Sequence, residues 1–170
     1  MNLHFRLHRT TIYLLLWLLL PACDTGGGEV QVGMATRMYP NVDERMWIYF
    51  ERFEKAAQER NESIDLVEAG ISGEIYEISK ANVVGLCNHN VIDPNHIILD
   101  GHFWNRSSNL KKELIVFHEL GHCYLLRGHK DDVNENGTCA SVMRSGTGGC
   151  LDLYNEDNRR EYLDELFDAE

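Results

Sequence analysis

The chain has 170 residues, a length that favours one domain over two. It contains 16 Lys and Arg against 27 Asp and Glu, which gives a formal net charge of −11 at pH 7. This acidic balance argues against nucleic acids and anionic lipid surfaces as partners, because a negatively charged protein is repelled by both. It suits a neutral or basic substrate better.

The first 22 residues indicate an export signal. Arg6 and Arg9 form a basic start, and the apolar run at 12–20 is too short to span a bilayer. The string LPAC that follows resembles a bacterial lipobox, which implies that residues 1–22 are removed and that Cys23 is lipidated. The alternative is a plain secretory signal cut near Ala22. Either cut removes two arginines and changes the formal net charge from −11 to −13.

Residues 23–36 are expected to form a flexible tether, since they begin with the polar, glycine-rich string CDTGGG. The remaining residues, 37–170, are expected to form the folded domain. With a lipid on Cys23, this domain would stand at the cell envelope, on the periplasmic or cell-surface side of a membrane. The lipid would then make the attachment, and no spanning helix would be needed.

The elements before residue 101 follow from the spacing of apolar residues. A first helix is predicted at 41–60, because its apolar residues recur every three or four positions: Met46, Tyr49, Phe50, Phe53 and Ala57. Strands are predicted at 64–69, 74–78, 82–87 and 96–100. A last helix is predicted near 156–167.

The string HELGH at 118–122 is the most informative feature of the chain. It lies in a proline-free, apolar segment at 108–126 that predicts a helix, ended by Arg127 and by Gly128 in a left-handed conformation. Residues four apart share one face of a helix, so His118 and His122 can aim their imidazoles at one metal ion. Glu119 is placed to act as a base on a water molecule bound to that ion.

The longer string HELGHCYLLRGH resembles the metzincin branch of zinc peptidases, and within it the matrixins, whose pattern is HExxHxxGxxH. The match departs at Leu125, which occupies the glycine position, and at the third histidine, which comes one residue late. The resemblance implies one catalytic zinc ion with His129 as third ligand and Glu119 as catalytic base. Asp131 or Asp132 remains an alternative third ligand, because zinc also accepts oxygen.

The string ASVMRSG at 140–146 resembles the metzincin Met-turn. This resemblance implies that Met143 lies beneath the metal as an apolar floor. Together the two motifs cover about residues 114–149 and indicate a class of reaction, with little information about the substrate.

Four cysteines remain after Cys23, and an even number in an exported chain favours disulfides. Three pairings are possible. The preferred one joins Cys87 to Cys123, which ties the preceding segment to the metal helix, and Cys139 to Cys150, which closes a loop around the Met-turn. The alternative, suggested by the resemblance to matrixin precursors, is a Cys87 thiol that blocks the zinc.

A calcium loop is indicated only weakly. Residues 132–137 match the first half of the D-x-N-x-N-G pattern, but Met143 stands where that loop needs its glutamate. Zinc is therefore the expected cofactor and calcium is disfavoured.

The expected fold is α+β and zincin-like: a small twisted mixed sheet, an active-site helix, a Met-turn and a C-terminal helix. The expected function is a zinc-dependent endopeptidase that binds a peptide or protein substrate as an added strand, along either 83–87 or 97–100. Two alternatives stay open. One is a non-catalytic binding lipoprotein with a structural zinc, and the other is a zinc amidase that acts on cell-wall peptides.

Overall fold

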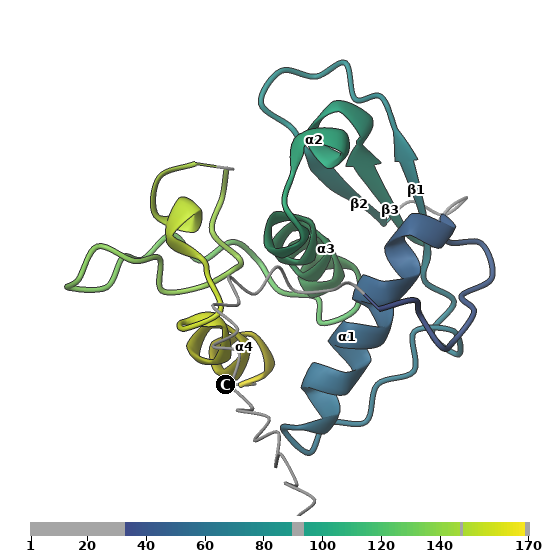
Figure 1. Ribbon diagram of the computed structural model, residues 1–170, viewed down its shortest axis with the longest axis horizontal. Helices are drawn as coiled ribbons and strands as arrows, with labels where there is room; N and C mark the ends of the chain where they lie inside the picture. The colour runs from purple at the N-terminus through teal and green to yellow at the C-terminus, as the bar shows by residue number, and fades with distance from the viewer. Residues whose placement is uncertain (1–32, 90–93, 147, 169–170) are drawn as a thin grey trace, which may run out of the picture.

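The computed structural model describes residues 33–89, 94–146 and 148–168 (Figure 1). The predicted export signal, Cys23 and most of the predicted tether lie outside these residues. The fold is α+β. Its elements, in chain order, are η1 (Glu44–Met46), α1 (Trp47–Gln58), β1 (Ser72–Tyr76), β2 (Gly85–His89), β3 (Pro94–Asp100), α2 (Gly101–Arg106), α3 (Asn109–Cys123), η2 (Gly149–Leu153) and α4 (Arg159–Phe167).

The three strands form a mixed sheet in the order β1-β3-β2, as expected of a small mixed sheet. β1 runs parallel to β3, and β2 runs antiparallel to it. The amide of Asp100 donates to the carbonyl of Val84 (2.9 Å), the residue just before β2, so alternate residues from Val84 onward turn their backbone groups toward β3. Gly85 therefore turns its own amide and carbonyl toward the outer edge of β2.

Helix α3 lies in the middle of the molecule, with the sheet on one side and α1 and α4 on others (Figure 1). The predicted apolar stripe of the first helix is buried as expected. Phe53 of that stripe shows how the helices meet, since its ring lies 5.2 Å from Phe117 of α3 and 4.9 Å from Phe167 of α4. Such aromatic contacts pack α1 against both α3 and α4.

Before α3, one sequence prediction was wrong and one helix was missed. The segment 64–69 is a turn and not a strand, because the carboxylate of Asp65 accepts from the amides of Val67 (3.0 Å) and Glu68 (2.9 Å). Such local bonds compete with strand pairing. Helix α2 was not predicted; the carboxylate of Asp100 caps it by accepting from the amide of Phe103 (2.7 Å).

Helix α3 begins at Asn109, one residue after the start of the predicted segment, with Ser108 as its N-cap, and it ends at Cys123 instead of continuing to 126. The left-handed residue beyond it is Leu126 (φ 57°), not Gly128. The amide of Arg127 donates to the carbonyl of Gly121 (2.9 Å), and this bond folds the chain back before Gly128 is reached.

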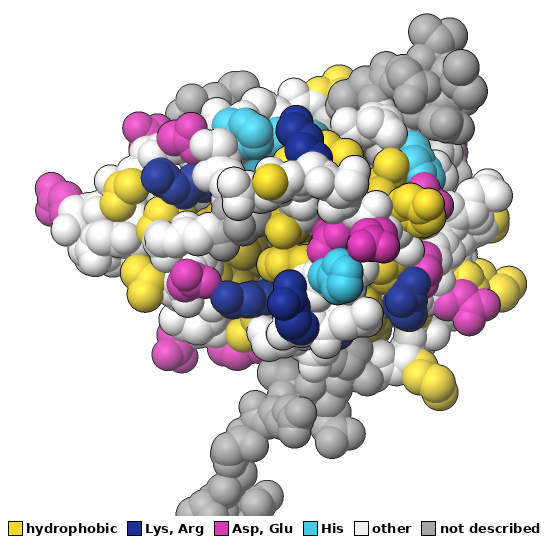
Figure 2. All heavy atoms as spheres, turned by 90° about the horizontal axis from the view of Figure 1, so that it is seen from above, with side chains coloured by type: hydrophobic (Ala, Val, Ile, Leu, Met, Phe, Trp, Pro, Cys, Tyr) yellow, Lys and Arg dark blue, Asp and Glu magenta, His cyan; other side chains and the backbone are white. Residues whose placement is uncertain are grey.

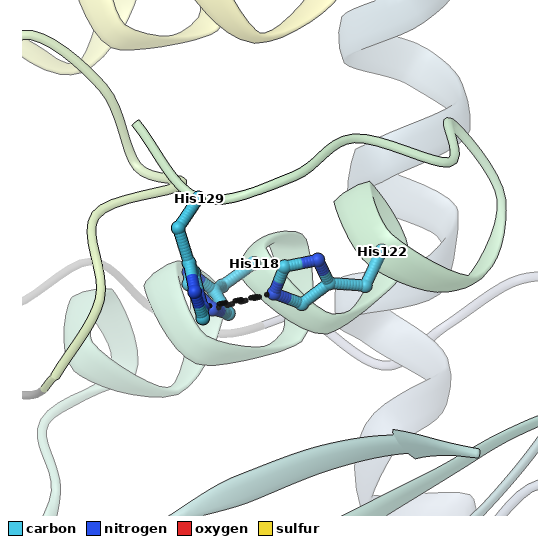
Figure 3. Close-up of side chains that lie close together, drawn as sticks. All are labelled: His118, His122 and His129. Carbon is cyan, nitrogen blue, oxygen red and sulfur yellow. Dashed lines mark hydrogen bonds between the residues drawn. The ribbon is translucent and has the colours of Figure 1, made fainter. Parts of the chain in front are cut away.

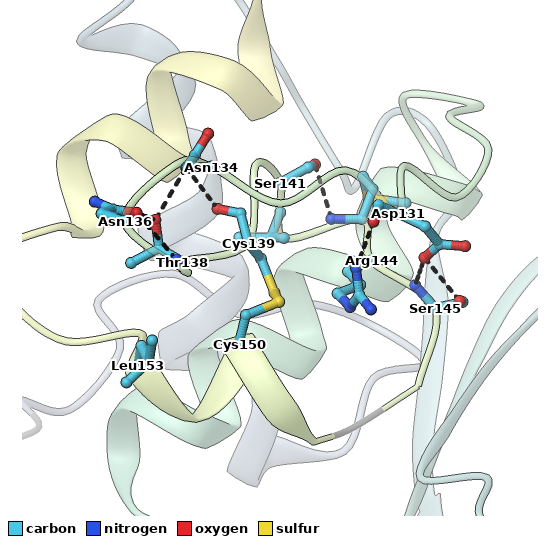
Figure 4. Close-up of a disulfide and its surroundings, with 12 residues drawn as sticks. Asp131, Asn134, Asn136, Thr138, Cys139, Ser141, Arg144, Ser145, Cys150 and Leu153 are labelled. Atoms are coloured by element: carbon cyan, nitrogen blue, oxygen red, sulfur yellow. Dashed lines mark hydrogen bonds between the residues drawn. A yellow bond between two sulfur atoms is a disulfide. The ribbon is translucent and has the colours of Figure 1, made fainter.

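Both disulfides have the pairing that the sequence favoured. Cys87–Cys123 joins β2 to the last residue of α3, with 5.6 Å between the Cα atoms. Cys139–Cys150 closes the loop that contains Met143, with 5.0 Å between the Cα atoms (Figure 4). The alternative of a zinc-blocking Cys87 thiol is wrong, because that sulfur is bonded to Cys123.

Positive and negative side chains alternate over the face in Figure 2, around apolar side chains that are visible at its centre. The excess of acidic residues thus forms no single acidic field on this face. None of the helices in the described part of the chain has the length and apolar character needed to cross a bilayer.

A buried carboxylate that the sequence did not indicate connects three helices. Glu113 of α3 is 1% exposed and accepts from Arg52 of α1 (3.1 Å), from Arg159 of α4 (2.5 Å) and from the hydroxyl of Tyr154 (2.9 Å). A carboxylate that is removed from water is tolerated only with partners of this kind.

We therefore expect Glu113→Gln to lower the free energy of unfolding by about 2 kcal/mol, because two cations lose their partner while the shape is kept. The matched control is Asp164→Asn, which breaks the ion pair with Arg60 (2.7 Å) at a carboxylate that is 59% exposed. The control should cost less than about 1 kcal/mol. Urea denaturation measures both, and equal losses would contradict a special role for Glu113.

Candidate metal centre

Three histidines converge beside α3. His118 and His122 lie on successive turns of the helix, and His129 comes from the chain that folds back after it (Figure 3). The Nε2 atom of His122 lies 3.1 Å from Nε2 of His118 and 3.2 Å from Nε2 of His129. Within the described ranges, this is the only group of three or more His, Cys, Asp or Glu side chains that could share a metal ion.

Two backbone carbonyls fix which ring nitrogens face the centre. Nδ1 of His118 lies 2.7 Å from the carbonyl of Val142, and Nδ1 of His122 lies 2.7 Å from the carbonyl of Arg127. A carbonyl oxygen only accepts, so each Nδ1 must carry the proton and donate it. In the neutral rings each Nε2 then presents a lone pair to the centre, as a metal-binding imidazole does.

The spacing of these nitrogens fits a metal ion. Neighbouring lone pairs at 3.1 and 3.2 Å repel unless a proton or a cation lies between them. Nitrogen ligands on a tetrahedral zinc ion, each at about 2.05 Å, are about 3.3 Å apart. The three histidines could therefore hold an ion of this kind.

Burial keeps His118 in the form that binds metals. Its ring is 8% exposed, and desolvation lowers its pKa to about 4, against a smaller upward effect of the bond to Val142. The ring is thus neutral at pH 7 and its Nε2 is free of a proton.

The turn at 141–143 packs against α3 next to the three histidines. Met143 is fully buried, its amide donates to the hydroxyl of Ser141 (2.9 Å), and its carbonyl accepts from the amide of Lys130 (2.9 Å). A methyl group built on Gly121 would collide with the sulfur of Met143, so the thioether lies directly against the helix turn between His118 and His122.

Neither aspartate considered as third ligand belongs to the cluster. The carboxylate of Asp131 accepts instead from the amide (2.8 Å) and hydroxyl (2.7 Å) of Ser145 (Figure 4). These bonds hold the pKa of Asp131 below its usual value, and the bond from the Ser145 hydroxyl has the larger effect. Asp131 thus fastens the segment after His129 to the segment after Met143.

The segment that resembles half a calcium loop is an ordinary turn. The amide group of Asn134 donates to the hydroxyl of Thr138 (3.0 Å), and the side-chain oxygen of Asn136 accepts from that same residue (Figure 4). These side chains bond to one another within the turn.

Glu119 lies in the cleft next to the histidines. It is 3% exposed and lines, together with His118 and His129, the two pockets that meet there. Desolvation raises the pKa of its carboxyl to about 8. A cation on the histidines would lower that pKa again and favour the carboxylate.

Gly85 is a residue of the cleft that the sequence analysis missed. A Cβ at this position would collide with Oε1 and the adjoining carbons of the Glu119 side chain, so β2 lies directly on the carboxylate. A glycine inside a strand is a signal of close approach and could have indicated this contact.

The cleft runs along β2 and α3, with the histidines at its centre. On one side is a pocket of about 240 Å³. Apolar residues from β2 and the segment before it, α2, α3, the Val142 turn and η2 line it: Val83, Val84, Leu86, Phe103, Leu114, Ile115, Val142 and Leu151. On the other side is a pocket between Leu86 of β2 and the chain that leaves α3 at Leu126. Gly85, Leu86, His118, Glu119 and His129 line both.

No family model matches this chain, and neither the curated proteins nor the solved structures contain a match.

We expect the metal-free protein to bind one Zn²⁺ per chain, and His118→Ala, His122→Ala or His129→Ala to weaken binding by about 100-fold or more, since each removes a ligand. Isothermal titration with Zn²⁺ measures this. The controls are His96→Ala and His102→Ala, because their rings contact Ser72 and Glu77 instead of the cluster. Undiminished affinity in His129→Ala would exclude it as a ligand.

We expect Gly85→Ala to lower the free energy of unfolding by about 1–3 kcal/mol, the usual cost of overpacking, while zinc affinity is retained. Adding Glu119→Asp, which shortens the side chain that the new methyl meets, should recover part of the loss. Gly128→Ala is the control, because a Cβ there meets nothing within 4 Å. If the changes in unfolding free energy of the two single variants simply add up in the double variant, the contact between Gly85 and Glu119 is refuted.

Proposed function

We propose that this protein is a zinc-dependent endopeptidase with a zincin-like domain of the metzincin type, exported and attached to a membrane through a lipid on Cys23. The observation that carries the proposal is the buried carboxylate of Glu119 in the same cleft as the three histidines. A metal site that serves only the fold has no use for a buried base beside it.

The residues of the site divide the chemistry between them. His118, His122 and His129 would hold the ion, and bound zinc supplies a Lewis acid that polarises a carbonyl and acidifies water. Glu119 takes the proton of the attacking water and later delivers it to the nitrogen that leaves. The carbonyls of Val142 and Arg127 keep the two helix imidazoles in the tautomer that binds.

The turn at 141–143 supports the Met-turn interpretation. Met143 lies against the helix turn between two of the ligands, and Val142 bonds to the first of them. These contacts are what an apolar floor under the metal requires.

The substrate backbone binds along β2. Of the two segments that the sequence allowed, 97–100 lies in β3, which is central in the sheet and has both edges occupied. β2 is at the end of the sheet, lines the cleft, and turns the amide and carbonyl of Gly85 outward. An extended peptide can add to such an edge by main-chain hydrogen bonds. One apolar side chain next to the scissile bond enters the 240 Å³ pocket.

The two alternative functions, a binding lipoprotein with a structural zinc and a zinc amidase, require different features of the site. A structural zinc is closed by four protein ligands, whereas the cluster in the described residues has three. A zinc amidase for cell-wall peptides would use the same residues on a different substrate. Peptidoglycan peptides therefore belong in the same assay as a protein-derived peptide library.

We expect Glu119→Gln to reduce peptide cleavage by about 10²-fold or more, the scale of a lost general base. The variant keeps the shape of the side chain, so zinc content and thermal midpoint should stay close to those of the wild type. Cleavage products are identified by mass spectrometry for both substrate classes. Wild-type protein that holds zinc and cleaves neither class would favour the binding lipoprotein, and cleavage that survives Glu119→Gln would remove the base from the mechanism.

A further inference from the structure

Leu126 has a backbone conformation that suits glycine. Its φ is 57°, in the left-handed region, where a Cβ crowds the following carbonyl oxygen. The chain has a glycine two residues later, at Gly128, but does not use it for this turn. The fold therefore carries a strained leucine where a residue without a side chain would be relaxed.

The side chain of Leu126 also contributes little to the core. It is 75% exposed, the largest exposed fraction of any leucine in the described residues. Backbone atoms of Arg127 form the hydrogen bonds of this turn. Its amide donates to the carbonyl of Gly121, and its carbonyl accepts from Nδ1 of His122. Neither bond needs a side chain at 126.

Leu126 lies in the wall of the pocket that contains the histidines. Leu126 lines the pocket formed with Leu86, Glu119 and His122. Arg127 also lines this pocket, but its guanidinium is bonded at α4, to the carboxylate of Glu165 (2.5 Å) and the carbonyl of Leu166 (2.9 Å). Arg127 thus brings backbone and no charge to the cleft.

We propose that Leu126 is a specificity-determining residue, which contacts an apolar side chain of the substrate on the side of the histidine cluster away from the 240 Å³ pocket. This inference rests on the proposed peptidase function. A peptide along the outer edge of β2 passes both pockets with the metal centre between them. The strain and exposure at Leu126 are explained when this contact is made, since backbone strain is retained at functional sites.

The experiment compares Leu126→Gly and Leu126→Asn with wild type. Both residues accept the left-handed conformation, and neither offers an apolar contact. The thermal midpoint and zinc affinity should be unchanged or higher, whereas kcat/KM for preferred peptides should fall by roughly tenfold, the scale of one lost apolar contact. In a randomised peptide library, the preference for apolar residues should weaken on one side of the cleaved bond only. Leu153→Asn is the control, a similar change at a leucine that is 47% exposed and lines neither pocket of the cleft.

A second measurement separates this inference from the proposed function. Zinc-loaded Glu119→Gln protein, with and without Leu126→Asn, is tested for binding to an array of short randomised peptides. One outcome is that the wild type cleaves no peptide, while peptide binding on the array still depends on Leu126. In that case the peptidase proposal fails and the contact stands. If the wild type cleaves and the Leu126 variants keep its kcat/KM and preferences, the contact is refuted and the peptidase stands. Loss of zinc or of thermal stability in Leu126→Gly would assign the residue to the fold.

Discussion

The hydrogen bonds from two imidazoles to the carbonyls of Val142 and Arg127 determine what the histidine cluster can do. They leave a lone pair on the inward nitrogen of His118 and of His122, so that both helix side chains are able to bind a metal ion. Each carbonyl lies outside α3, so the cluster depends on how two loops are held. The Cys139–Cys150 disulfide and the bonds between Asp131 and Ser145 hold one loop, and the left-handed turn at Leu126 holds the other.

The cleft owes its shape to a match between strand and helix spacing. Gly85 and Cys87 are two residues apart in β2 and meet Glu119 and Cys123, which are four residues apart in α3. Two strand residues span about 6.7 Å and four helix residues about 6 Å, so β2 can run along one face of the helix. A disulfide joins the two elements at one contact. At the other, glycine makes room for a carboxylate.

The features that sequence reasoning found are those with a periodic or chemical signal. The apolar stripe through Phe53 predicted α1, and the four-residue spacing of His118 and His122 predicted their meeting at one point. The preference for Cys87–Cys123 and Cys139–Cys150 was confirmed. It rested on two positions in the sequence, since Cys123 directly follows His122 and Cys139 directly precedes the segment 140–146. Features that depend on tertiary contact were missed or wrong: the partners of Glu113, the closeness of Gly85 to Glu119, and the end of α3, where Leu126 took the conformation expected of Gly128.

The Cys87–Cys123 bond makes the geometry of the cleft depend on the compartment in which the chain folds. It is the covalent link between the strand that lies on Glu119 and the end of the helix that carries the histidines. In a reducing cytoplasm such a bond does not persist, and only packing would hold β2 against α3. A chain that is exported before it is oxidised would complete its cleft outside that compartment. The bond that stabilises the domain would then also determine where β2, Glu119 and the histidines come together as one cleft.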